Sequence, residues 1–246
     1  TELAAMGYTD PAQALAHLSA LRDGRACRVA SATARQRLGA LLPGLLRAAG
    51  GTVNPELTLG RLCTLLEAVA TRSVYLAMLV EHPAAQEHLA RLMGASAWIS
   101  DWITAHPVVL DELLDARVLM EEPDHGAWRA ELARMLAENA GDQEREMDAL
   151  RHFQHAQSFR LLAQDLAGQL TIERLADHLS ALADVVLEAT LGACWRHLAG
   201  ADAPPPRFAI IGYGKLGGKE LGYASDLDIV FVYDVDPDDP DGDAKL

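Results

Sequence analysis

Residues 207–233 read RFAIIGYGKLGGKELGYASDLDIVFVY, and this stretch decides the fold expected at the end of the chain. Its two apolar runs, 208–211 and 229–233, have the length, the β-branched content and the flanking glycine of buried strands. A glycine-rich turn follows the first run, and Asp-Leu-Asp leads into the second. The pattern therefore predicts a buried strand, a turn with a very short helix, and a second buried strand.

The residues between the two runs indicate phosphate and metal chemistry. Glycine lets backbone N–H groups approach an anion closely, and the turn contains Gly214, Gly217 and Gly218. Asp226 and Asp228 lie two apart at the start of the second predicted strand, where period-2 geometry points both side chains to one face. Two such carboxylates repel unless a cation lies between them, and Mg²⁺ prefers hard oxygen ligands. The pattern predicts a phosphate-binding turn beside a Mg²⁺ site, which suits nucleotide chemistry.

The stretch resembles the nucleotidyltransferase superfamily, which includes DNA polymerase beta and the kanamycin nucleotidyltransferases. In the signature of that superfamily, Gly-Ser precedes an Asp-x-Asp that lies between hydrophobic residues. Here ten residues, 216–225, separate Gly214-Lys215 from Asp226. Lys215 stands where the signature usually has serine. Our hypothesis is that a contact between this lysine and a phosphate replaces the lost hydroxyl contact.

A narrower resemblance covers GYGKLGGKELGYASDLDIVFVYD, residues 212–234. It looks like the adenylyltransferases of glutamine synthetase, bifunctional bacterial enzymes that contain two such domains. The Gly-Tyr-Gly-Lys opening and the Leu-Gly-Tyr before Ala-Ser-Asp resemble the C-terminal, adenylylating half. The N-terminal, adenylyl-removing half more typically reads Gly-Met-Gly-Lys and has Asn before Ser-Ser-Asp. The resemblance extends, more loosely, to the helical region before the motif.

The resemblance implies an activity, a substrate and a set of site residues. The activity is transfer of AMP from ATP to a tyrosine of glutamine synthetase, which controls nitrogen assimilation. Asp226 and Asp228 would be the catalytic residues and the Mg²⁺ ligands. The nucleotide would contact five further residues: Gly214, Lys215, Gly217, Gly218 and Ser225.

The resemblance also implies regulation and a missing ligand. Regulation in this family involves the signalling protein PII and glutamine, and the helical region 1–120 is the expected place for it. In the superfamily a third carboxylate, on a later strand, completes the metal site, and no residue here is assigned to it. We therefore expect the chain as given, a truncated piece of the catalytic domain, to have little or no transferase activity.

Composition limits the partners and the compartment. The chain has 246 residues with 21 Lys and Arg against 35 Asp and Glu, a net charge of −14. Such a chain lacks the clustered basic residues of a sequence-independent nucleic-acid binder, so no nucleic-acid partner is expected. No apolar run has the length of a membrane span, and no signal peptide opens the sequence. Three widely spaced cysteines suit a reducing compartment, so we expect a cytoplasmic protein.

The rest of the chain predicts helices. Helix starts are expected at Asp10-Pro11, Ser31 and Thr171, where a capping side chain precedes the helix. Long helices are expected over 55–82 and 142–168, and Pro43 should kink or split the helix that begins after Ser31. The fold class is mainly α: a helical bundle followed by the opening β-α-β part of a nucleotidyltransferase α/β domain. The expected domains are residues 1–120, helical and regulatory; 121–206, helices leading into the catalytic domain; and 207–246, the start of that domain.

Three other interpretations stay open. A small-molecule nucleotidyltransferase would share the motif, although such enzymes tend to begin near it. A helical protein-interaction module would use the motif only for packing, without catalysis. A dinucleotide-binding turn fits because Gly212 to Gly217 matches Gly-x-Gly-x-x-Gly. It would require a βαβ unit of about thirty residues and would leave Asp226 and Asp228 unexplained.

Overall fold

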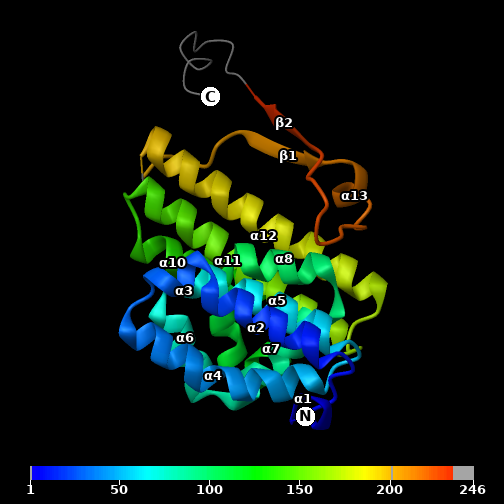
Figure 1. The fold of residues 1–246 in the computed structure, drawn as a ribbon. Coiled ribbons are helices and arrows are strands. Elements are labelled where there is room, and N and C mark those ends of the chain that lie inside the picture. Colours follow the sequence, from blue (N-terminus) through cyan, green and yellow to red (C-terminus); the bar gives the residue numbers. More distant parts are fainter. Residues whose placement is uncertain (1, 201, 235–246) are drawn as a thin grey trace. The chain divides into compact units, whose positions relative to one another are not determined.

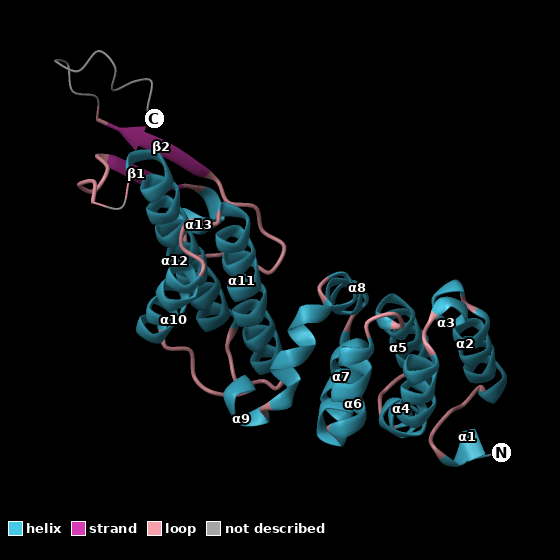
Figure 2. Cartoon of the chain, turned by 90° about the vertical axis from the view of Figure 1, so that its left-hand side faces the viewer, coloured by secondary structure: helices cyan, strands magenta, loops and turns pink. Residues whose placement is uncertain are grey.

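The computed structural model describes residues 2–200 and 202–234. The chain divides into two compact units, residues 1–119 and 120–246, and each is taken by itself. Helices dominate both units, which confirms the prediction of a mainly helical chain (Figures 1 and 2). The predicted division at residues 120 and 206 into functional domains stays a prediction.

The elements of the first unit are α1 (Glu2–Ala5), α2 (Pro11–Asp23), α3 (Arg25–Val29), α4 (Ala32–Gly50), α5 (Pro55–Val69), α6 (Ser73–Glu81), α7 (Pro83–Ala95), α8 (Ala97–Ala105), the 3₁₀ helix η1 (Pro107–Leu114) and α9 (Ala116–Leu119).

Capping side chains start the helices where the sequence predicts them. The Asp10 carboxylate accepts hydrogen bonds from the N–H groups of Ala12 and Gln13, each at 3.0 Å, at the start of α2. The Ser31 hydroxyl oxygen accepts one from the Ala34 N–H at 3.1 Å at the start of α4. The first N–H groups of a helix have no acceptor inside it, so each cap satisfies donors that would otherwise be unpaired.

The predicted helix over 55–82 is wrong, because two helices occupy that range. α5 ends at Val69, and α6 begins at Ser73. Between them a tight turn forms, in which the Arg72 N–H donates to the Val69 carbonyl at 2.8 Å. The turn lets apolar residues of both helices, such as Leu66 and Leu76, reach the core, where each is at most 1% exposed.

Pro43 does not split α4, so that part of its prediction is wrong. The helix runs unbroken from Ala32 to Gly50 with the proline inside it. Proline has no N–H, so the carbonyl of Gly39 lacks its helical partner. Gly39 and Pro43 are both exposed, so water can bond to that carbonyl. Leu41 and Leu45 on the opposite side of the helix are fully buried, and their packing holds the two halves in one helix.

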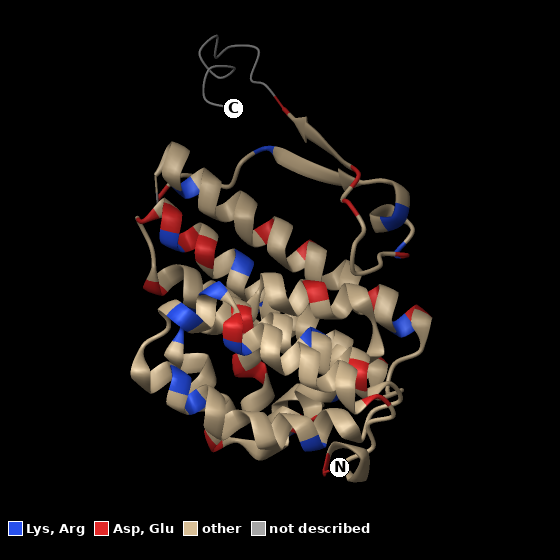
Figure 3. Ribbon diagram, viewed as in Figure 1, with Lys and Arg blue, Asp and Glu red and all other residues tan. Residues whose placement is uncertain are grey.

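The second unit is built on three long helices, α10 (His125–Glu138), α11 (Gln143–Leu166) and α12 (Ile172–Ala199), each packed against the other two. Their buried apolar side chains form one core, which includes Trp128, Phe153 and Leu179. Acidic and basic residues are interspersed along the helices (Figure 3). Exposed ion pairs such as Arg134–Glu138 contribute at most about 1 kcal/mol each, so apolar packing holds this unit together.

A β-hairpin with a one-turn helix follows α12. β1 (Phe208–Gly212) and β2 (Ile229–Tyr233) pair antiparallel, with Gly212 opposite Ile229, and α13 (Gly214–Gly217) lies between them in the sequence. A dinucleotide-binding βαβ unit has parallel strands, so this pairing excludes the dinucleotide interpretation. The indole N–H of Trp195 on α12 donates to the Pro204 carbonyl at 2.8 Å and ties the proline-rich segment before β1 to the helix.

The prediction of buried strands is wrong. In β1 the residues alternate between half-buried and exposed, and in β2 only Ile229 is half-buried. Phe231 is 57% exposed. The described chain supplies only two strands, so no further strand covers these apolar side chains.

Glu146 is a buried carboxylate that joins three segments of the second unit. It lies in the first turn of α11 and is 3% exposed. Its Oε1 accepts a hydrogen bond from the Gly141 N–H at 3.1 Å, and its Oε2 lies 2.9 Å from Nε2 of His197 on α12. A buried carboxylate is tolerated only when such partners replace water.

We expect Glu146→Ala to lower the free energy of unfolding by about 2–3 kcal/mol, because it leaves the Gly141 N–H without its acceptor and removes the hydrogen bond to His197. Denaturant unfolding at neutral pH measures this loss. Glu144→Ala is the matched control, since Glu144 is exposed in the same turn of α11. Equal losses for the two variants would contradict this account.

In the first unit, Glu56 stabilises the start of α2 from α5. Its Oε1 accepts hydrogen bonds from the Asp10 N–H at 2.6 Å and from the Thr9 hydroxyl at 3.1 Å. The bond from the Asp10 N–H is the main cause that lowers the pKa of the Glu56 carboxyl below its usual value. Hydrogen bonds of this kind favour the charged form of an acid.

This lowered pKa predicts a pH dependence of stability. The contribution of Glu56 is fully present above the pKa that the carboxyl has in the unfolded chain, about 4.3, and is lost as the pH falls through the lower folded pKa. We expect Glu56→Gln to be less stable than wild type at pH 7 and to lose less stability than wild type on acidification below pH about 4.3. Unfolding curves across that range test this, with the exposed Glu87→Gln as control.

Candidate functional site

The antiparallel pairing brings the glycine turn and the Asp-Leu-Asp segment together. Beyond the pair Gly212–Ile229, the Tyr213 N–H donates to the Asp228 carbonyl at 2.7 Å. This bond extends the ladder by one step, so the residue that opens the turn and the residue that precedes β2 are held side by side. Two predicted site residues, Gly214 and Asp228, are therefore neighbours in space.

Gly214 and Gly217 are positions where only glycine fits. Gly214 has φ +53°, and a Cβ added there would lie 2.2 Å from Oδ2 of Asp228. A Cβ on Gly217 would lie 2.6 Å from the Gly212 carbonyl oxygen. The absence of side chains at these two positions lets the carboxylate of Asp228 lie against the turn and lets the turn fold back on β1.

Asp226 and Asp228 lie in the loop before β2 rather than on the strand, which begins at Ile229. Both are exposed, and neither has a basic partner within ion-pairing distance among the residues that the structure describes. Over those same residues, no group of three or more His, Cys, Asp or Glu is placed to hold a metal ion. Asp226 and Asp228 thus offer two uncompensated carboxylates, a donor set that fits part of the coordination of Mg²⁺.

The backbone N–H groups of the turn fall into two sets, those with an acceptor inside the turn and those without one. Those of Gly217 and Gly218 donate to the carbonyls of Tyr213 and Gly214, each at 3.0 Å. Those of residues 214–216 lie in the first turn of α13 and have no acceptor inside the helix. Lys215, also in this turn, is exposed.

The segment between α13 and β2, residues 218–228, is here called the carboxylate loop. Its Ser225 hydroxyl oxygen accepts a hydrogen bond from the Gly222 N–H at 3.0 Å, so this serine shapes the loop from within. Leu221 is 6% exposed and belongs to the helical core, as does Leu216 of α13. A cavity of about 170 Å³ separates part of the loop from α11 and α12.

Tyr223 attaches the loop to α11 through a contact that the sequence pattern does not indicate. The Tyr223 hydroxyl donates to Oδ2 of Asp165, at the end of α11, at 3.2 Å. Tyr223 stood in the quoted motif without a role. Asp165 lies 58 residues earlier and carries no local signal that would connect it to the motif.

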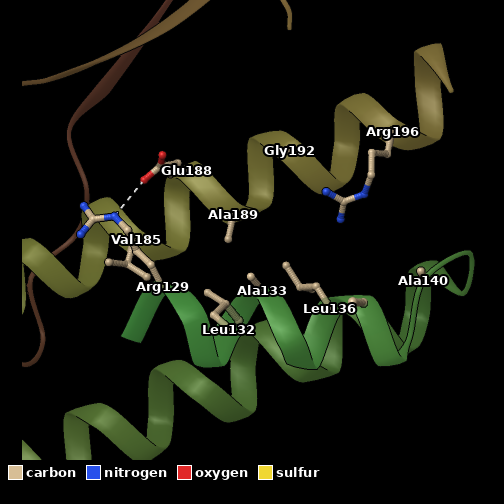
Figure 4. A pocket seen from close by; sticks show the side chains of 11 residues that line it. Arg129, Leu132, Ala133, Leu136, Ala140, Val185, Glu188, Ala189, Gly192 and Arg196 are labelled. Carbon is tan, nitrogen blue, oxygen red and sulfur yellow. Dashed lines mark hydrogen bonds and ion pairs between the residues drawn. The ribbon is translucent and has the colours of Figure 1, made fainter. Parts of the chain in front are cut away.

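A larger hollow, of about 560 Å³, lies between α10 and α12 (Figure 4). At one end Arg129 Nε and Glu188 Oε2 are 3.3 Å apart, and the Arg196 side chain lies at the other end. The lining is otherwise small or aliphatic and contains no residue of the predicted site: Leu132, Ala133, Leu136, Ala137, Ala140, Val185, Ala189 and Gly192. The hollow has no paired nucleophile and base, so the glycine turn with the carboxylate loop is the candidate site.

Comparison with known proteins identifies the class to which this turn and loop belong. Residues 86–246 match the model of the family described as glutamate-ammonia ligase adenylyltransferase. The chain belongs to this family.

Curated relatives agree with that assignment. The chain is 50% identical over 242 residues to the bifunctional glutamine synthetase adenylyltransferase/adenylyl-removing enzyme of Chromobacterium violaceum, covering 98% of this chain and 27% of the relative. It is 52% identical over 200 residues to the protein of that name from Aromatoleum aromaticum, covering 81% and 21%. For the protein of Neisseria meningitidis serogroup B the values are 47% over 241 residues, 98% and 27%. The chain thus spans about a quarter of the length of these relatives.

No helix within residues 2–200 and 202–234 combines the length and the hydropathy needed to cross a bilayer.

The geometry of the turn predicts the effect of Gly214→Ala. The left-handed backbone alone should cost about 1–2 kcal/mol of stability, and the added methyl group must displace the Asp228 carboxylate. Unfolding measurements test the cost, and backbone chemical shifts of residues 213 and 228 test the displacement. Gly192→Ala on α12 is the control, because a Cβ there would meet only the Arg196 side chain, at 3.6 Å. Unchanged shifts in Gly214→Ala would show that the carboxylate does not depend on this glycine.

Proposed function

We propose that this chain carries the opening of the catalytic domain of an enzyme that transfers AMP from ATP to a tyrosine of glutamine synthetase. Family membership supports the activity, and the names of the relatives support the protein substrate. The observation that carries the proposal for this chain is the contact of Asp228 with Gly214, which joins the carboxylate loop to the glycine turn. The β-α-β segment would be the start of a nucleotidyltransferase fold.

The proposed roles follow from the placement of the residues. Asp226 and Asp228 would hold Mg²⁺, which, when bound, neutralises negative charge on the triphosphate. The N–H groups of residues 214–216 and the Lys215 ammonium would bind phosphate oxygens. Gly217 and Gly218 would shape the turn, since their own N–H groups are already bonded. Ser225 would position the loop through Gly222.

In the proposed reaction, the phenolic oxygen of the substrate tyrosine forms a bond to the α-phosphorus of ATP. The bond from that phosphorus to the bridging oxygen breaks, diphosphate leaves in line, and the phenolic proton is released. Catalysis would come from positioning and from charge neutralisation rather than from a covalent intermediate. The PII protein as a regulator and the cytoplasm as the compartment are parts of this proposal that rest on the family.

The first test is binding of Mg²⁺–ATP to this chain by calorimetry, compared with the Asp226→Ala, Asp228→Ala double variant. We expect the double variant to lose binding, because the carboxylates that hold the metal are gone. The second test uses an enzyme of the relatives' full length that contains these residues. Asp226→Asn or Asp228→Asn should abolish AMP transfer to glutamine synthetase while far-ultraviolet circular dichroism is unchanged. Full activity in either variant would overturn the proposal.

A further inference from the structure

The carboxylate loop has few attachments to the body of the second unit. Leu221 is packed in the helical core, and Tyr223 and Ile229 are packed against it. Near its end, the Asp228 carbonyl accepts the Tyr213 N–H. Asp226 and Leu227 lie between these points and are exposed. The position of Asp226 therefore depends on how firmly the loop is held on either side of it.

Tyr223 holds the loop by a polar contact as well as by packing. Tyr223 precedes Asp226 by three residues. Its hydroxyl donates to Oδ2 of Asp165 at 3.2 Å. Burial, together with the Asp165 carboxylate, raises the pKa of this hydroxyl, so the proton stays on Tyr223 at all physiological pH values. Tyr223 is therefore the donor and Asp165 the acceptor of this hydrogen bond.

The position of Asp165 in α11 is unfavourable for a carboxylate. It lies in the last turn of the helix, whose C-terminal end carries partial negative charge and disfavours a carboxylate. No lysine, arginine or histidine among the described residues forms an ion pair with it. Among the described residues, the Tyr223 hydroxyl is the group that donates a hydrogen bond to the Asp165 side chain.

We propose that Tyr223 and Asp165 are positioning residues, which hold the carboxylate loop so that Asp226 and Asp228 are ready to share one cation. The inference rests on the proposed function. Without a cation the two carboxylates repel each other, and a loop that is free to move would relax them apart. Fixing the loop beside Asp226, in addition to the contact at Asp228, keeps a larger fraction of molecules in the binding-competent arrangement, which raises the apparent affinity.

The first experiment needs no metal and no activity. Hydrogen exchange of the amides of residues 219–228 is measured on this chain as wild type, Tyr223→Phe and Asp165→Ala. Tyr223→Phe keeps the ring in the core and removes only the hydroxyl. We expect both variants to exchange faster in the loop, by about twofold to tenfold, with α11 and α12 unchanged. The controls are Tyr75→Phe on α6 of the first unit and Asp184→Ala on α12, both outside the loop.

The second experiment measures the cation directly. Mn²⁺, with ATP present, is titrated into the same variants and followed by electron paramagnetic resonance. We expect the half-saturating Mn²⁺ concentration to rise by about twofold to tenfold in Tyr223→Phe and in Asp165→Ala. The double variant should need no more Mn²⁺ for half-saturation than either single variant, because both substitutions remove the same hydrogen bond. Asp165→Asn should stay near wild type, because its amide oxygen still accepts the hydrogen bond.

Assays of the full-length enzyme distinguish a positioning role of these residues from an effect on stability alone. The two variants should need more Mg²⁺ for half-maximal AMP transfer, with kcat at saturating Mg²⁺ retained, whereas a lower melting temperature alone would not shift that requirement. Unchanged loop exchange in Tyr223→Phe would overturn the positioning role, whatever the activity. A third outcome separates this proposal from the proposed function. If the wild-type chain bound no Mn²⁺ and the wild-type full-length enzyme transferred no AMP, while the loop exchange of the variants still changed as expected, the proposed function would fail and the contact would be structural only.

Discussion

The close approach of the Asp228 carboxylate to the backbone of Gly214 is the constraint on which the rest of the hairpin depends. A side chain at position 214 would occupy the place of a carboxylate oxygen, and the backbone there has the left-handed conformation that glycine tolerates. The register of the strands follows, because the Tyr213 N–H can reach the Asp228 carbonyl only when Gly212 lies opposite Ile229. The position of the Asp228 carboxylate and the strand pairing are thus set by the same close approach.

The helices of the second unit explain how such a small hairpin keeps this geometry. A two-stranded hairpin by itself is marginally stable in water, and most side chains of β2 are exposed. The turn and the carboxylate loop each insert one leucine, Leu216 and Leu221, into the core of α10, α11 and α12. The hairpin is therefore anchored to the helices through its turn and loop more than through its strands.

Local rules in the sequence predicted much of the fold. Capping residues such as Ser31 and Thr171 marked helix starts because their effect involves only the next turn of backbone. The break after Val69 was missed because no glycine or proline marks it in the sequence, and the turn lets both helices bury their own apolar faces. The sequence motif also predicted a site that joins the glycine turn to Asp226 and Asp228, and the structure places Asp228 beside Gly214. It could not connect Tyr223 to Asp165, because nothing local pairs residues 58 positions apart.

The same letters, Gly-x-Gly-x-x-Gly, support two kinds of nucleotide chemistry, and strand direction separates them. In a dinucleotide-binding unit a long helix returns the chain to a parallel strand, and an acidic residue at the far end of that strand meets a ribose. Here α13 has one turn, so the chain can return only antiparallel, beside β1. That return brings the Asp228 carboxylate against the glycine turn itself, where we propose that a triphosphate and its cation bind. The length of the connection, more than the glycine pattern, therefore excludes a dinucleotide-binding unit here.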